Sequence, residues 1–76
     1  NRQRALVRAQ IRRRVTHLSQ REREILDGVA WGKMNRTMAA ELGISQRTVE
    51  IHRGRLMDKM EAKSVAHLVR MVIDAE

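Results

Sequence analysis

An arginine, a glutamate, an isoleucine and a glycine occur close together in the chain, as Arg47, Glu50, Ile51 and Gly54. If this stretch is a helix with its core face centred on Val49 and Met60, a rotation of about 100° per residue turns these four residues and Asp58 outward. Arginine can bond guanine O6 and N7, glutamate can accept from cytosine N4, and isoleucine can contact a thymine methyl group. Glycine would let a duplex approach the backbone closely. These types and spacings predict a helix that reads base edges in DNA.

The alternative for the same residues is an ordinary solvated helix face that carries one stray isoleucine. A glycine in the middle of a helix is about 1 kcal/mol less favourable than alanine. Gly54 therefore needs a reason to be there, and the close approach of DNA supplies one. We favour the interpretation in which this face enters the major groove.

Residues 35–60 supply the helices that would position this face. A first helix is predicted over Asn35–Leu42, with Asn35 as its N-cap and with Met38, Ala39 and Leu42 on its apolar face. Gly43 suits the positive φ at which a helix ends. Two helices joined by a short turn that contains glycine are typical of a helix-turn-helix, which we place at residues 35–54.

The second helix of this pair is predicted over residues 45–60 and is the expected recognition helix. Ile44 precedes it as an apolar plug, and Ser45 can cap its first turn. Its buried face repeats at helical spacing, through Val49, Leu56 and Met60. His52 lies at the border of that face, where we interpret it as a half-buried packing and hydrogen-bonding residue, with a phosphate contact as the alternative.

A helix that begins after Ser19 is predicted from the capping box that Ser19 forms with Glu22. Leu18 can pack beneath the cap, Gly32 marks the end of the helix, and the buried stripe is Ile25, Leu26 and Val29.

Trp31 is expected to pack near the helix end. Arg53, which the helical wheel turns partly toward the core, is expected to pair with Glu22 or Glu24.

Most of the formal net charge of +7 comes from residues 1–15, which hold six arginines and no acidic residue. Apolar residues follow one another there at helical spacing, as Leu6, Val7, Ile11 and Val15. Three interpretations are open for residues 1–17: an inter-domain linker helix, half of a short coiled coil, or an arm that contacts phosphate. We favour a solvated linker helix. Because residues 16–76 are nearly balanced in charge, the charge alone only weakly indicates that the folded part binds a polyanion.

The last helix is predicted to begin after Ser64, and its apolar face is wide. We expect this helix both to close the core of the monomer and to pack against a second copy of the domain. The residues expected at that homodimer contact are Val65, Leu68, Val69 and Val72.

Several classes of protein receive no support from the sequence. There is no cysteine for disulfides or thiolate sites, and His17, His52 and His67 do not have the spacing of metal ligands. No arrangement of side chains predicts an enzyme, a metal site or a cofactor. No apolar run is long enough to cross a bilayer and no signal peptide is visible, so we expect a cytoplasmic protein. Because the chain starts at Asn1 instead of methionine, we interpret it as part of a longer protein.

The motifs LSQREREIL, GISQRTVEIHR and KMEAKSVAHLVRM, in this order, resemble the LuxR/FixJ-type output domains of bacterial response regulators, and the last two are most similar to the FixJ branch. The resemblance implies an all-α, four-helix domain over residues 18–76 whose third helix reads the major groove. It also implies a preceding phospho-acceptor receiver domain joined through a linker helix over residues 1–17. The base-reading positions of the family match Glu50, Ile51 and Gly54, to which we add Arg47. The phosphate-contact positions of the family match Arg36, Arg47 and Thr48, and we also expect Asn35 and Arg55 to contact phosphate.

The sequence therefore predicts the DNA-binding domain of a two-component transcription regulator that acts as a homodimer on double-stranded DNA, with RNA polymerase as a further possible partner. Two alternatives are the final domain of a sigma factor and a dimerisation or protein-interaction module that does not bind DNA.

Overall fold

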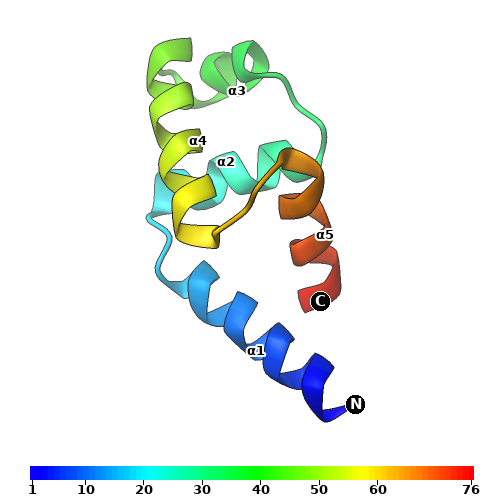
Figure 1. Ribbon diagram of the computed structural model, residues 1–76. Helices are drawn as coiled ribbons and strands as arrows, with labels where there is room; N and C mark the ends of the chain where they lie inside the picture. Colours follow the sequence, from blue (N-terminus) through cyan, green and yellow to red (C-terminus); the bar gives the residue numbers. More distant parts are fainter.

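The computed structural model describes residues 1–76 and contains five helices and no strand, which confirms the predicted all-α class (Figure 1). The α3 helix and the start of α4 lie at one end of the molecule, α2, α5 and the second half of α4 lie in the middle, and α1 projects at the other end. The helices, in chain order, are α1 (Arg2–Thr16), α2 (Gln20–Ala30), α3 (Asn35–Leu42), α4 (Gln46–Met60) and α5 (Val65–Ala75).

Local signals in the sequence explain where most of these helices begin. Ser19 accepts a hydrogen bond from the backbone N–H of Glu22, and the Glu22 carboxylate accepts one from the backbone N–H of Ser19, so the predicted capping box is complete. Ser45 and Ser64 cap α4 and α5 in the simpler way, each accepting from a backbone N–H three residues later. All three predicted serine caps are therefore confirmed.

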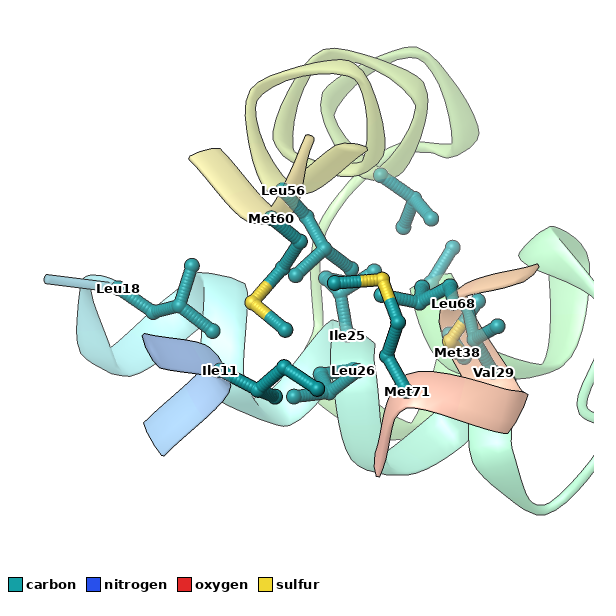
Figure 2. Packing of buried hydrophobic residues seen from close by; sticks show 12 residues of the cluster. Ile11, Leu18, Ile25, Leu26, Val29, Met38, Leu56, Met60, Leu68 and Met71 are labelled. Atoms are coloured by element: carbon teal, nitrogen blue, oxygen red, sulfur yellow. The ribbon is translucent and has the colours of Figure 1, made fainter. Parts of the chain in front are cut away.

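One core joins all five helices (Figure 2). Five of its residues are fully buried, and they come from α2, α4 and α5: Ile25, Val49, Leu56, Met60 and Leu68. The predicted buried stripes of α2 and α4 are thus confirmed. Burying each such side chain contributes about 1.5–3 kcal/mol, so the core fixes the position of α4 on α2.

The helix α1 is packed along its second half and exposed along its first. Ile11 is only 4% exposed and Val15 packs against the core, whereas Leu6 is 65% and Val7 50% exposed. Arg12 Nε donates to the carbonyl oxygen of Ala75 at 3.1 Å, and Arg14 Nη1 donates to that of Met60 at 3.3 Å. The second half of α1 is therefore fastened to the ends of α4 and α5.

Two predictions about the ends of α2 and α3 were wrong. Asn35 is the first residue of α3, and the N-cap is Met34, which makes no side-chain cap. Asn35 is turned away from that role because its Oδ1 accepts from Arg53. Trp31 does not pack: it is the C-cap of α2 and is 83% exposed.

Candidate nucleic-acid interface

The turn between α3 and α4 sets the angle of the helix-turn-helix. The α3 helix ends at Gly43 with φ +68°, the left-handed conformation that glycine adopts without steric penalty. Ile44 then packs partly into the core and Ser45 returns to extended backbone as the cap of α4. These features agree with the predicted turn, and they place α4 beside α3 at one end of the molecule (Figure 1).

The outer face of α4 holds the four residues predicted to read bases. The buried residues Val49, Leu56 and Met60 fix the opposite face against the core. Ile51 is 42% exposed, and a side chain at Gly54 would meet nothing within 4 Å. The Arg47 guanidinium lies 3.6 Å from the Glu50 carboxylate, and both side chains are more than half exposed. The structure thus brings a paired arginine and glutamate, an isoleucine and open backbone onto one accessible helix face.

The residues predicted to contact phosphate lie around that face. Arg36 is exposed in the first turn of α3, and Arg55 is exposed on α4. The Thr48 hydroxyl lies 2.9 Å from Ser45 Oγ at the start of α4. At about 100° per residue, Thr48 and Arg55 fall on the same edge of the base-reading face. This arrangement suits a helix in the groove with cations at its border.

Arg53 does not pair with Glu22 or Glu24, so that prediction was wrong. Its Nη1 donates to Asn35 Oδ1 at 2.8 Å, which joins α4 to the start of α3. The bond holds the two helices of the motif together. It also leaves the amide nitrogen of Asn35 without a partner in the chain.

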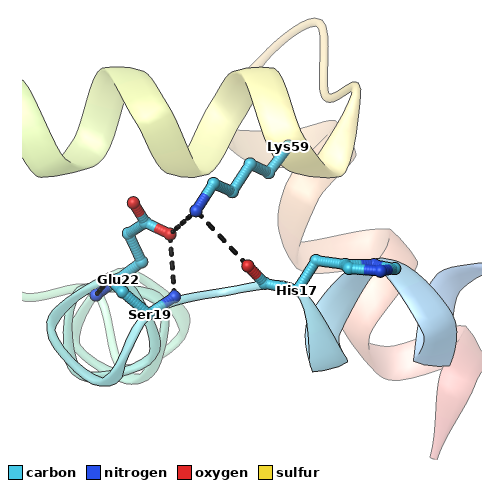
Figure 3. Close-up of polar contacts among 4 residues, drawn as sticks. All are labelled: His17, Ser19, Glu22 and Lys59. Atoms are coloured by element: carbon cyan, nitrogen blue, oxygen red, sulfur yellow. Dashed lines mark hydrogen bonds and ion pairs between the residues drawn. The ribbon is translucent and has the colours of Figure 1, made fainter.

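The Glu22 carboxylate is instead held by Lys59, a contact that the sequence did not predict (Figure 3). Lys59 Nζ donates to Glu22 Oε1 at 2.7 Å and to the carbonyl oxygen of His17 at 3.3 Å. The Lys59 ammonium and the backbone N–H of Ser19 together lower the pKa of Glu22 from its ordinary value of 4.5. This cluster fastens the last turn of α4 to the start of α2 and so supports the recognition helix.

His52 is half-buried on α4, as predicted, but its buried Nδ1 has no hydrogen-bond partner. The hydrogen-bonding part of that prediction is therefore not seen at this atom.

The helix-turn-helix geometry and the exposed face of α4 agree with comparisons to known proteins. Residues 16–72 match the family described as bacterial regulatory proteins, luxR family. The chain belongs to the luxR family. The prediction of a DNA-binding, transcription-regulatory domain is confirmed at the level of this family. The membership also decides against the sigma-factor alternative.

Relatives of this luxR-family chain include FixJ proteins. It is 52% identical over 63 residues to the transcriptional regulatory protein FixJ of Rhizobium meliloti, covering 83% of this chain and 31% of that protein. The crystal structure of full-length FixJ from B. japonicum superposes with a TM-score of 0.89 at 40% identity, covering 96% of this chain and 36% of that one. The solution structure of the C-terminal transcriptional activator domain of a Sinorhizobium FixJ superposes with a TM-score of 0.75 at 51% identity. The match covers 86% of this chain and 82% of that one. The chain thus spans about a third of the length of the full-length relatives it matches.

Proposed function

We propose that this luxR-family domain inserts α4 into the major groove of double-stranded DNA and reads sequence with Arg47, Glu50, Ile51 and the open backbone at Gly54. The exposed face of α4, which combines these four residues, is the observation that carries the proposal. Arg36, Thr48, Asn35 and Arg55 would position the domain on phosphates, because contacts to phosphate fix register whereas base contacts provide specificity.

We further propose a homodimer formed through α5. Leu68 is fully buried in the core of the monomer, so it cannot contribute to a contact between copies as expected from the sequence. Val65 is 40% and Ile73 57% exposed, and Val69 and Val72 are half-buried. At about 100° per residue these four residues share one face of α5. Dimers of helix-turn-helix domains bind half-sites about one helical turn of DNA apart.

For the whole protein we propose a cytoplasmic response regulator. In this arrangement residues 1–17 link a receiver domain to residues 18–76, and RNA polymerase is a further partner. Two observations support this arrangement. Most of the length of the FixJ relatives lies outside the match, and the first half of α1 is exposed. No helix of the chain combines the length and the apolar character needed to cross a bilayer.

Selection of bound sequences from random duplexes tests the DNA-binding proposal, first with the unchanged chain and then with Glu50→Gln. Because this substitution keeps the shape of the side chain and removes its charge, we expect the preferred base pair to change at one position of each half-site. Discrimination there should fall by roughly tenfold or more, since one good base contact is worth about 1–3 kcal/mol.

Glu41→Gln, an exposed acid on α3 outside the proposed base-reading face, is the matched control and should leave the selected sequence unchanged. An unchanged preference for Glu50→Gln would remove Glu50 from the base-reading set. Selection of no sequence by the unchanged chain would refute the proposed function as a whole.

A further inference from the structure

The only aromatic residue of the chain lies on its surface. Trp31 is 83% exposed at the end of α2, and Met34, in the same connection to α3, is 63% exposed. An indole that becomes covered by a partner buries about 150–250 Å² and is a frequent centre of binding energy in protein interfaces. The position of Trp31 therefore suggests a contact outside the chain.

A hollow of about 220 Å³ lies beside this ring, between α2 and α3. Its floor is formed by Gly28 and by Met38, which is 2% exposed. A methyl group added at Gly28 would lie 2.3 Å from Met38 Sδ, so the glycine leaves the space that the methionine fills. The apolar residues of the lining are Trp31, Met38 and Leu42, and the remaining side chains are charged. We call this recess between the two helices the Trp31 groove.

The rim of the Trp31 groove is acidic, although the chain as a whole carries a charge of +7. Glu24, Asp27 and Glu41 stand there against a single Lys33. Glu24 pairs with Arg21 and Glu41 with Lys33, each at 2.9 Å, whereas Asp27 has no partner. An arginine placed on the indole face would gain a cation–π contact and could bond the Asp27 carboxylate. Because Glu24 and Glu41 are already paired, Asp27 is the carboxylate left for a partner, and it fits a basic group of a protein but not a DNA phosphate.

The groove also lies next to the proposed DNA contacts. Met34 directly precedes Asn35 and Arg36, the phosphate-contact candidates at the start of α3. A protein seated on the Trp31 groove would therefore stand close to the duplex, where a basic surface is favoured a second time by the phosphates.

We propose that the Trp31 groove binds the basic face of a second protein on the same DNA, with an arginine of that protein against the Trp31 ring. This inference rests on the proposed DNA-binding function. Since that function is transcription regulation, purified RNA polymerase holoenzyme is the probe of choice. The proposed dimer face on α5 involves other residues and remains free for a second copy of the chain.

The experiment measures holoenzyme binding to the fluorescently labelled chain already bound to its selected duplex. Trp31→Ala and Asp27→Lys should each weaken this binding by roughly tenfold, the size of a strong interface contact. The chain is saturated with duplex in every measurement, because Asp27→Lys adds positive charge beside the proposed phosphate contacts Asn35 and Arg36 and should itself strengthen duplex binding. Trp31→Ala should leave the affinity of the chain for the duplex within about twofold, because Trp31 is not among the proposed DNA contacts. The matched controls are Leu6→Ala and Glu76→Lys, which change an exposed apolar and an exposed acidic residue on other elements.

Three results would overturn the inference. One is the absence of holoenzyme binding by the unchanged chain, and another is equal binding by the Trp31 and Asp27 variants and the controls. The third is a shift of Trp31 fluorescence with chain concentration in the absence of holoenzyme, which would assign the groove to a second copy. Loss of duplex binding by the unchanged chain would instead refute the proposed function, so the two failures are distinguishable.

Discussion

At the scale of single residues, Gly28 and Met38 are a matched pair. Alanine is intrinsically about 1 kcal/mol better than glycine inside a helix. At position 28, however, the added methyl group would lie 2.3 Å from Met38 Sδ and 2.9 Å from its Cγ. Met38 is buried and overpacking costs about 1–3 kcal/mol, so we expect Gly28→Ala to lower the free energy of unfolding by about 1 kcal/mol. Urea denaturation measures this change.

The same substitution in a Met38→Val background supplies the control. With the longer side chain gone, the clash disappears and only the helix preference remains, so Gly28→Ala should there stabilise the protein by about 1 kcal/mol. Stabilisation in both backgrounds would mean that Met38 moves aside freely, and the pairing argument would then fail.

Glu22 makes the free energy of unfolding depend on pH in the acid range. It is 2% exposed and its pKa lies below 4.5, first because Lys59 bonds it and then because the Ser19 N–H does. A carboxyl group with a lowered folded-state pKa stabilises the protein above its unfolded-state pKa, and this stabilisation is lost as the pH falls through the folded-state pKa. At pH 7 we expect Glu22→Gln to lower the free energy of unfolding by about 1–3 kcal/mol.

This difference between Glu22→Gln and the unchanged chain should shrink as the pH falls below 4.5, and urea denaturation at a series of pH values will show whether it does. Glu24→Gln is the matched comparison, because the Glu24–Arg21 pair is partly exposed and contributes at most about 1 kcal/mol. A Glu22→Gln difference that stays constant down to acid pH would exclude the charge on Glu22 as the source.

At the scale of helices, Arg14 ties α1 to the end of the recognition helix. It donates to the carbonyl oxygen of Met60 at 3.3 Å and pairs with Glu61 at 3.1 Å. A cation at a helix C-terminus satisfies a free carbonyl group and interacts favourably with the helix dipole. We expect Arg14→Ala to destabilise the protein by about 1 kcal/mol and to speed amide hydrogen exchange in the last turn of α4. Arg13→Ala should do neither, because the Arg13 side chain is exposed and makes no contact of this kind.

The ends of the helices and the outward face of α4 could be predicted because they depend on short-range patterns in the sequence. The Ser19–Glu22 box and Gly43 are signals within one turn, and the spacing of Val49, Leu56 and Met60 already determines which face of α4 is outward. The contacts between helices could not be deduced in this way. Whether Arg53 reaches Asn35 and Lys59 reaches Glu22 depends on the crossing of helices, which core volume sets. The exposure of Trp31 likewise could not be deduced, because it depends on which residues of the other helices come near the end of α2.

At the scale of the whole molecule, the charge is distributed away from the proposed interface. Most of the excess arginines are on α1, whose first half projects at the end opposite α3 in a molecule 42 Å long (Figure 1). At physiological salt the Debye length is about 8 Å, so these charges should contribute little to DNA affinity.

Arg36→Ala should weaken binding to all sequences about equally and reduce the salt slope by about one unit. Arg4→Ala removes the same charge from α1 and should leave the slope unchanged, as titrations over a salt series will test. Equal flattening by both variants would mean that α1 also contacts the duplex and that net charge, rather than its placement, governs affinity.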